Sequence, residues 1–200
     1  MFLIVLIIDC LYFSDSKKRN VLTSVTMKLK KETVIWFFGL SGSGKTTLAD
    51  TLNEQLLKKG FQTRKLDGDV LRKGLNVDLG FEEEDRKENI RRAAEVAKLF
   101  SKTGIVTIAS FITPKEELRA LVKEIIGKEN VIDIYVDCSI ETCIKRDVKG
   151  LYKKALNKEI LNFTGIDSVF ESSKNHCFTV NTEEESVVQS VNSIVSFLEC

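Results

Sequence analysis

Short apolar runs alternate with segments of helical periodicity along this chain. A continuous apolar run is typical of a buried parallel strand and occurs at residues 34–38, and further strands are expected at 62–66, 105–112, 131–136 and 177–180. Helices are expected at residues 45–59, 83–103, 114–126, 140–146, 150–162 and 184–198. The alternation predicts a parallel sheet with helices on both faces, a three-layer α/β/α fold that binds ligands at the carboxyl ends of its strands.

A glycine-rich segment joins the first strand to the first helix. Its sequence, GLSGSGKTT, fits the pattern G-x-x-x-x-G-K-[ST], in which backbone N–H groups and the helix start surround phosphate oxygens. Lys45 can reach the β- and γ-phosphates, and the Thr46 hydroxyl can bind Mg²⁺. We therefore predict a P-loop nucleoside-triphosphate hydrolase fold with ATP and Mg²⁺ as cofactors. The residues expected to hold them are Gly39, Ser41, Gly42, Ser43, Gly44, Lys45, Thr46 and Thr47.

Two acids after the second strand narrow the class of enzyme. The chain is too short for most P-loop motors, has no guanine-reading N-K-x-D motif, and lacks the usual Walker B Asp after the third strand. Asp67 and Asp69 are then the best acids for metal binding and for accepting a proton from an acceptor hydroxyl, as small-molecule kinases require. Thr46 and Asp67 are the first candidates for the metal, but the residues do not decide between the two acids. An alternative is that Asp69 only caps the following helix.

Four longer motifs carry a resemblance to one family of such kinases. They are LDGDVLRKGLNVDLGFEEEDRKENIRRAAEVAKLF at residues 66–100, SFITP at 110–114, RDVKGLYKKA at 146–155 and NFTGID at 162–167. Their order and spacing resemble those of adenylyl-sulfate kinases, over residues 30–182. The resemblance implies transfer of the ATP γ-phosphoryl group to the 3′-hydroxyl of adenylyl sulfate, which gives 3′-phosphoadenylyl sulfate and ADP. It also implies one kinase domain over residues 27–200, a homodimer, and a separate sulfurylase that supplies adenylyl sulfate.

The chemistry of that acceptor agrees with several residues in these motifs. Adenylyl sulfate carries a phosphate and a sulfate, and the planar guanidinium groups of Arg72 and Arg86 suit such oxyanions. Phe81 and Phe163 can stack on adenine, although Phe81 could instead be a core residue. Asn89 lies three residues after Arg86, on the same helix face, and can make polar contacts. Each of these five is similar to a substrate-contact position of the family.

Residues 146–170 resemble the family's mobile lid, which excludes water so that ATP is not hydrolysed before the acceptor is aligned. The resemblance places Arg146 against ATP and Lys149 against adenylyl sulfate, and it adds Ile112 and Thr113 to the substrate and catalytic residues. Thr113 replaces a more usual serine, which has been suggested as a phosphorylated intermediate. Direct in-line transfer needs no covalent step, so we expect Thr113 to make a contact at most.

The sequence also departs from the family pattern. Val70 replaces a usual Asn, and Lys115 and Glu116 stand where an aromatic and a basic residue are common. We expect Arg119 to supply positive charge nearby. These changes could alter substrate affinity, but they remove no group that the transfer requires.

Charge and cysteine content restrict the partners and the compartment. The 29 acids and 30 bases nearly cancel, so no global field favours a nucleic acid or a membrane. The five cysteines form no C-x-x-C pair and accompany a single histidine, which favours reduced thiols in the cytoplasm over a zinc site or a disulfide framework. Residues 2–13 are apolar apart from Asp9 and Cys10, but the segment is too short to span a bilayer. We expect Met27 to be the natural start and residues 1–26 to be a non-native or disordered extension.

Two alternatives remain open at this point. The chain could phosphorylate another nucleotide or a polyol, although Arg72 and Arg86 argue for a sulfate-bearing acceptor. It could also be a catalytically idle nucleotide-binding subunit of a larger sulfate-activating assembly. The presence of Lys45, Asp67 and Asp69 argues against the second alternative.

Overall fold

The computed structural model describes residues 29–173 and 175–199, so the predictions for Met27 and residues 1–26 lie outside the described part. Five parallel strands form one sheet in the order β2-β3-β1-β4-β5. Each predicted strand is present with its ends moved by a residue or two. The strands are β1 (Val34–Phe38), β2 (Thr63–Asp67), β3 (Val106–Ser110), β4 (Val131–Asp137) and β5 (Phe178–Asn181).

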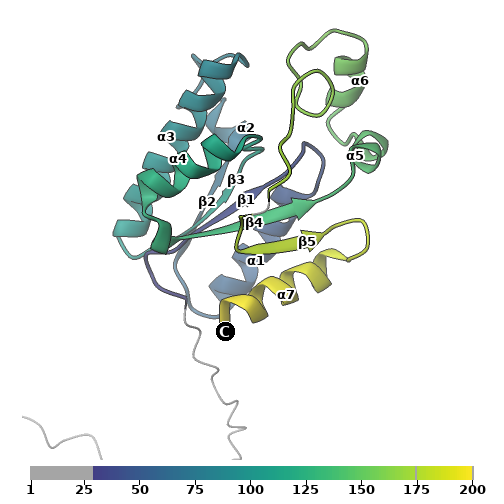
Figure 1. Ribbon diagram of the computed structural model, residues 1–200. Coiled ribbons are helices and arrows are strands. Elements are labelled where there is room, and N and C mark those ends of the chain that lie inside the picture. The colour runs from purple at the N-terminus through teal and green to yellow at the C-terminus, as the bar shows by residue number, and fades with distance from the viewer. Residues whose placement is uncertain (1–28, 174, 200) are drawn as a thin grey trace, which may run out of the picture.

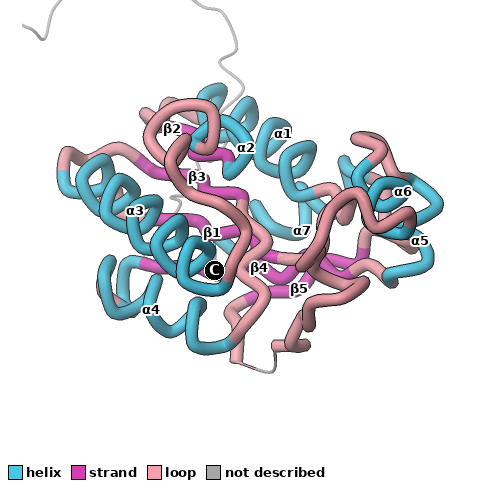
Figure 2. Tube along the Cα trace, turned by 90° about the horizontal axis from the view of Figure 1, so that it is seen from above, coloured by secondary structure: helices cyan, strands magenta, loops and turns pink. Residues whose placement is uncertain are grey.

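Helices cover both faces of the sheet, which confirms the three-layer fold (Figures 1 and 2). Helices α3 and α4 lie on one face, and α1 and α7 on the other. The helices are α1 (Lys45–Lys58), α2 (Gly68–Leu71), α3 (Glu83–Lys102), α4 (Glu116–Ile126), α5 (Ile140–Arg146), α6 (Leu151–Leu156) and α7 (Val187–Glu199), with a 3₁₀ turn, η1, at Lys128–Asn130. None of them is long and apolar enough to span a bilayer.

Three helix predictions are corrected by the structure. Helix α6 ends at Leu156 and does not continue to residue 162. Helix α2 was not predicted, because four residues are too few to show a helical period. Helix α4 begins at Glu116, after Lys115 as its N-cap, rather than at Pro114, because the chain first turns a corner at Thr113.

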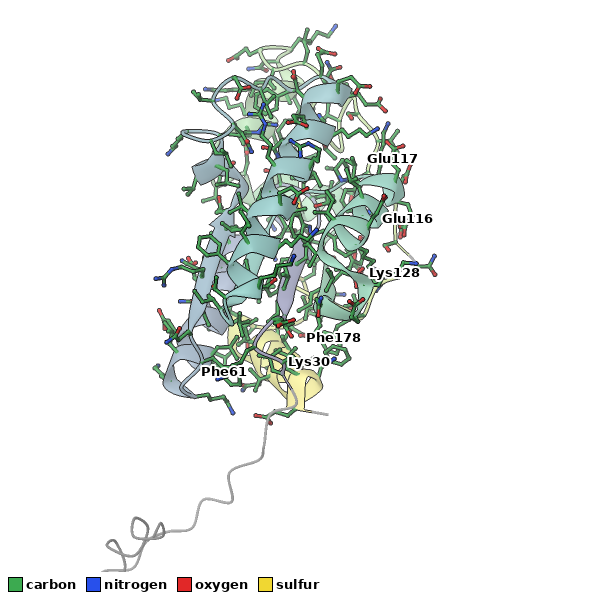
Figure 3. All side chains as sticks on the ribbon, turned by 90° about the vertical axis from the view of Figure 1, so that its left-hand side faces the viewer. Lys30, Phe61, Glu116, Glu117, Lys128 and Phe178 are labelled. Atoms are coloured by element: carbon green, nitrogen blue, oxygen red, sulfur yellow. The ribbon has the colours of Figure 1, made fainter. Side chains whose placement is uncertain are left out.

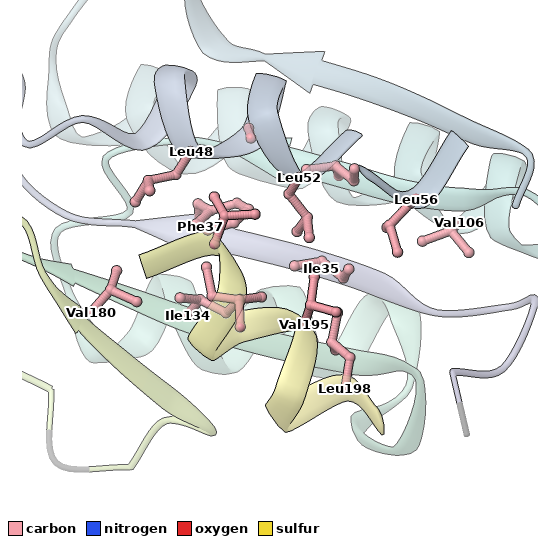
Figure 4. Packing of buried hydrophobic residues seen from close by; sticks show 14 of the residues in the cluster. Ile35, Phe37, Leu48, Leu52, Leu56, Val106, Ile134, Val180, Val195 and Leu198 are labelled. Atoms are coloured by element: carbon pink, nitrogen blue, oxygen red, sulfur yellow. The ribbon is translucent and has the colours of Figure 1, made fainter. Parts of the chain in front are cut away.

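The central strand determines how the two layers pack. Every residue of β1 is buried, as expected for a strand inside a parallel sheet. Ile35 and Phe37 face α1, whose Leu48, Leu52 and Leu56 pack against them together with α7 (Figure 4). Trp36 and Phe38 face the opposite layer of α3 and α4. Because β1 is fixed between the two helix layers, it gives the glycine-rich loop that follows it a rigid support.

Helix α4 starts near the carboxyl edge of the sheet. Its first turn carries Glu116 and Glu117, whereas Lys128 follows the opposite end (Figure 3). Acids at the start and bases at the end of a helix are favourable for its dipole.

The segment predicted to be a lid packs against the glycine-rich loop (Figure 1). Cys143, Tyr152 and Phe163 form a small apolar cluster that also includes Leu40 of the loop. The Tyr152 hydroxyl donates a 2.8 Å hydrogen bond to the carbonyl of Ser41. This places the lid directly over the phosphate-binding turn.

Candidate active site

The glycine-rich loop turns sharply between β1 and α1. Gly39 has φ +153°, and a Cβ atom on it would lie 2.5 Å from the carbonyl oxygen of Val136. Gly44 has φ +99°, in the left-handed region, and directly precedes α1. Both positions thus favour glycine, and Lys45, Thr46 and Thr47 at the start of α1 line the pocket described below.

Lys45 is buried in this loop. Its Nζ donates a 2.6 Å hydrogen bond to the carbonyl oxygen of Leu40. Burial disfavours the charged ammonium and lowers its pKa from 10.5 to about 8. Among the residues that the structure describes, no carboxylate forms a salt bridge with Lys45, so its charge is available for phosphate oxygens.

We expect ATP binding to weaken as pH rises through about 8, because the neutral Lys45 amine no longer attracts phosphate. At pH 9 the apparent Kd should be about tenfold higher than at pH 7. Titration calorimetry with a non-hydrolysable ATP analogue at pH 7, 8 and 9 measures this change. Lys45→Arg, which stays charged, should flatten the profile. A wild-type profile as flat as that of the variant would contradict the prediction.

Asp67 lies at the end of β2 and connects three elements. Its Oδ2 accepts hydrogen bonds from the Thr46 hydroxyl at 2.9 Å and the Ser110 hydroxyl at 2.8 Å. Its Oδ1 accepts the backbone N–H of Asp69 at 2.9 Å, so Asp67, not Asp69, caps α2. Burial alone would raise its pKa, but these hydrogen bonds outweigh burial and hold the pKa below its ordinary value. Asp67 is therefore an anionic oxygen donor beside a hydroxyl, which suits Mg²⁺.

Asp69 occupies a different environment in the first turn of α2. Its carboxylate is exposed and forms an ion pair with Lys149, which comes from the predicted lid. The alternative in which Asp69 is only a helix cap is wrong, since Asp67 has that role. The ion pair joins the lid to the sheet edge across the pocket.

A pocket of about 400 Å³ lies at the carboxyl ends of the strands, between α2 and α3 on one side and the lid on the other. It is lined by most of the predicted site residues, which come from segments more than a hundred residues apart. These are Ser41, Gly42, Gly44, Lys45, Thr46, Thr47, Asp67, Asp69, Arg72, Phe81, Arg86, Asn89, Ile112, Thr113, Lys149 and Phe163. Gly39, Ser43 and Arg146 are not in the lining.

One end of the pocket is cationic and aromatic. The Arg72 guanidinium lies 4.4 Å from the ring centre of Phe81, and that of Arg86 lies 6.0 Å from it. Phe81 is 55% exposed, so the core alternative for it is wrong. Arg72 donates to the carbonyls of Leu79 and Gly80, and Arg86 to that of Phe81. Within the described residues neither arginine forms a salt bridge with a carboxylate, which leaves two half-buried charges for an anionic ligand.

Arg146 lies behind the phosphate loop. It donates to the carbonyl of Thr182 at 2.6 Å, and the Thr182 hydroxyl donates to the carbonyl of Ser43 at 2.9 Å. Arg146 therefore reaches the loop through Thr182, which the motifs did not indicate.

Ser110, Thr164 and Arg119 lie in or beside the site without a predicted role in it. Ser110 and Thr164 line the pocket and were not predicted, although Ser110 stands where a Walker B acid would be and Thr164 belongs to the NFTGID motif. Thr164 accepts a 2.9 Å hydrogen bond from Arg86. Arg119 lies near these residues, as expected, since it donates to the Thr113 carbonyl at 3.1 Å, but its side chain is 3% exposed and outside the pocket lining.

Known proteins match most of this chain. The family model for adenylylsulphate kinase matches residues 31–181. An adenylyl-sulfate kinase of Clostridium acetobutylicum is 51% identical over 86% of this chain and 86% of its own length, and one of Bacteroides thetaiotaomicron is 49% identical over 82% of each. The structure of the Mycobacterium tuberculosis APS kinase CysC in complex with AMPPNP and APS has a TM-score of 0.81 and 39% identity, over 84% of this chain and 98% of that chain. The chain belongs to the adenylylsulphate kinase family.

Proposed function

We propose that this protein is an adenylyl-sulfate kinase that transfers the γ-phosphoryl group of ATP to the 3′-hydroxyl of adenylyl sulfate. One observation carries the proposal: two half-buried arginines, which form no salt bridge to a carboxylate of residues 29–173 or 175–199, flank the exposed ring of Phe81, in the same pocket as the phosphate loop. A sulfate-bearing adenine nucleotide supplies both an anion for the arginines and a base for the ring. The family membership and the related structure that holds AMPPNP and APS support the same substrates.

The phosphate loop supplies the electrostatic part of the catalysis. Backbone N–H groups and the start of α1 bind the phosphates, and the Lys45 ammonium moves from the Leu40 carbonyl to the γ-phosphate. We propose that the Thr46 hydroxyl and the Asp67 carboxylate hold Mg²⁺, which would neutralise charge on the β- and γ-phosphates when bound. One carboxylate and one hydroxyl fit Mg²⁺, because this ion usually keeps waters and phosphate oxygens as its other ligands.

Asp69 is the proposed proton acceptor. As the 3′-oxygen of adenylyl sulfate attacks the γ-phosphorus, its proton passes to the Asp69 carboxylate, and the bond between the γ-phosphorus and the bridging oxygen breaks to release ADP. The ion pair with Lys149 orients this carboxylate. Once Asp69 is protonated, the Lys149 ammonium can contact the anionic groups of adenylyl sulfate instead. Arg72, Arg86, Phe81, Asn89 and Phe163 would bind the acceptor itself.

Residues 146–170 would act as the lid that excludes water. The Tyr152 hydrogen bond to Ser41 and the apolar cluster around Cys143 hold this segment over the phosphate loop. A closed lid protects ATP from hydrolysis before the acceptor is aligned. We further propose a single domain over residues 27–200, a homodimer in the cytoplasm, and a separate sulfurylase as the source of adenylyl sulfate.

An acceptor panel tests the proposed function. The full chain is incubated with ATP, Mg²⁺ and one of adenylyl sulfate, AMP or a sugar polyol, and ADP release is followed by a coupled assay. We expect ADP release only with adenylyl sulfate, at a rate far above that without an acceptor. Faster release with AMP or the polyol would favour the other kinase, and no acceptor-dependent release at all would leave only a nucleotide-binding subunit.

Loss of the cationic end of the pocket should affect only the acceptor. Arg72→Gln is expected to raise the KM for adenylyl sulfate about tenfold or more, because a charge-assisted bond to an anion is lost. The KM for ATP should change less than about twofold. Arg91→Gln is the matched control, since Arg91 is exposed on α3, outside the pocket lining, and forms a salt bridge with Glu88. Equal effects of the two substitutions on the KM for adenylyl sulfate would contradict the assignment.

A further inference from the structure

The corner between β3 and α4 contains the most unusual backbone of the site. Thr113 is buried, at 1% exposure, and has φ +43°. A β-branched residue rarely adopts positive φ, because its side chain then clashes with the backbone. Strained residues of this kind persist only where their surroundings hold them, and they cluster at functional sites.

Two side chains from other elements hold this corner. Trp36 of β1 donates its ring N–H to the Thr113 hydroxyl at 3.0 Å, and its ring stacks on Phe111 with centroids 4.8 Å apart. Arg119 of α4 donates to the Thr113 carbonyl at 3.1 Å and lies over the ring of Phe38 at 5.0 Å. Trp36 and Arg119 are almost fully buried and lie outside the pocket lining, so neither faces the substrate space.

The corner also connects the phosphate loop with the segment that follows the lid. The carbonyl of Ile112 accepts the N–H of Gly39 at 3.2 Å, which joins the corner to the first residue of the phosphate loop. The carbonyl of Pro114 accepts the N–H of Glu171 at 2.8 Å, and Arg119 donates to the Glu171 carbonyl at 2.9 Å. Arg119 thus fixes Thr113 and the post-lid segment with one guanidinium group, whose fork geometry permits both bonds at once.

We propose that Trp36 and Arg119 are positioning residues, which act through the strained Thr113 corner to fix the wall of the acceptor site against the phosphate loop. This inference rests on the proposed function, since it concerns the acceptor of that reaction. The Thr113 hydroxyl serves the same purpose: it accepts the Trp36 N–H on the core side of the corner and does not act as a nucleophile. Ile112, Thr113 and Pro114 line the pocket, so a displaced corner alters the acceptor site first.

Thr113→Val and Thr113→Ser separate the hydroxyl from the shape of the residue. Valine removes the acceptor of the Trp36 bond, whereas serine keeps it. We expect Thr113→Val to raise the KM for adenylyl sulfate about tenfold, with kcat and the KM for ATP changed less than about threefold. Thr113→Ser should keep all three constants near their wild-type values. Trp36→Phe should have the same effect as Thr113→Val. The double variant should be no worse than either single one, because both remove one bond.

Thr107→Val is the matched control. Thr107 is fully buried in β3, and its hydroxyl faces the Ala97 carbonyl at 3.5 Å, away from the pocket. This variant should lower stability as Thr113→Val does, with no change in the KM for adenylyl sulfate. Arg119→Lys, which keeps the charge but cannot form both bonds, should raise that KM by a similar factor.

Trp36 is the only tryptophan of the chain, so its fluorescence reports on the corner directly. We expect Thr113→Val, but not Thr107→Val, to change the emission spectrum of the folded protein. An unchanged KM and spectrum in Thr113→Val, or additive effects in the double variant, would overturn the inference.

A loss of kcat of about a thousandfold in Thr113→Val, with phosphate recovered on Thr113 of the wild type, would instead make Thr113 a nucleophile. A wild type that does not use adenylyl sulfate would refute the proposed function, whereas the fluorescence comparison would still decide whether the Trp36–Thr113 bond holds the corner.

Discussion

Lys45→Met is expected to lower kcat by about three orders of magnitude and, at the same time, to raise the Tm of the unliganded protein. Activity falls because no other side chain of the phosphate loop brings a positive charge to the γ-phosphate. Stability rises because the ammonium is buried against a carbonyl and its charged form is disfavoured, as the pKa of about 8 indicates. The substitution therefore separates the destabilisation that the buried charge causes in the folded protein from the contribution of that charge to catalysis.

The pH dependence of stability provides a second measure of the same residue. Between about pH 8 and 10.5 the unfolded chain still binds the Lys45 proton and the folded chain does not, so the free energy of unfolding should rise with pH in this window. Lys45→Met should lack this contribution. Lys58→Met, at the exposed end of the same helix, is the control and should change neither kcat nor this profile. A Lys45→Met protein with the kcat of the wild type would refute the role of Lys45 in catalysis.

Asp67→Asn and Asp69→Asn are each expected to lower kcat by about two to three orders of magnitude, for different reasons. Asp67 lies against the Thr46 hydroxyl, so its loss should also raise the Mg²⁺ concentration needed for half-maximal rate. Asp69 lies against Lys149 on the acceptor side, so its loss should leave the Mg²⁺ requirement unchanged. The measurement is the initial rate as a function of Mg²⁺ for the three proteins.

Glu84→Gln supplies the control for both acids, because Glu84 is an exposed carboxylate in the first turn of α3 outside the pocket lining. Its rate and Mg²⁺ dependence should match the wild type. Near-normal turnover in both aspartate variants would end the assignment of these residues. A raised Mg²⁺ requirement in Asp69→Asn alone would reverse the two roles.

The regular parts of the fold were predictable because their signals are local. A continuous apolar run marked β1, and the helical spacing of apolar residues marked α1, whose Leu48, Leu52 and Leu56 are buried. The phosphate loop was predictable for the same reason, because the tight turn needs glycine at fixed positions and the motif contains glycine at those positions. The place of Asp67 at the sheet edge followed from the parallel topology, whereas the place of Arg86 in the pocket followed from the resemblance to the family.

Side-chain direction was not predictable, because it depends on partners far along the chain. Arg119 was expected to supply positive charge near Glu116, but its burial was not foreseen: its guanidinium lies 5.0 Å from the ring centre of Phe38 and 5.9 Å from that of Phe170. The link from Arg146 to the phosphate loop depends on Thr182, which lies after the last motif. In each case the missing information is a tertiary contact.

Identification of the reaction product tests the central claim most directly. The full chain is incubated with adenylyl sulfate, Mg²⁺ and ATP labelled in its γ-phosphoryl group, and the products are separated and located by NMR. We predict one equivalent of ADP for each labelled nucleotide, with the label on the 3′-oxygen of the ribose of adenylyl sulfate. Label that appears only as inorganic phosphate, or on a different oxygen of the acceptor, would contradict the proposed function.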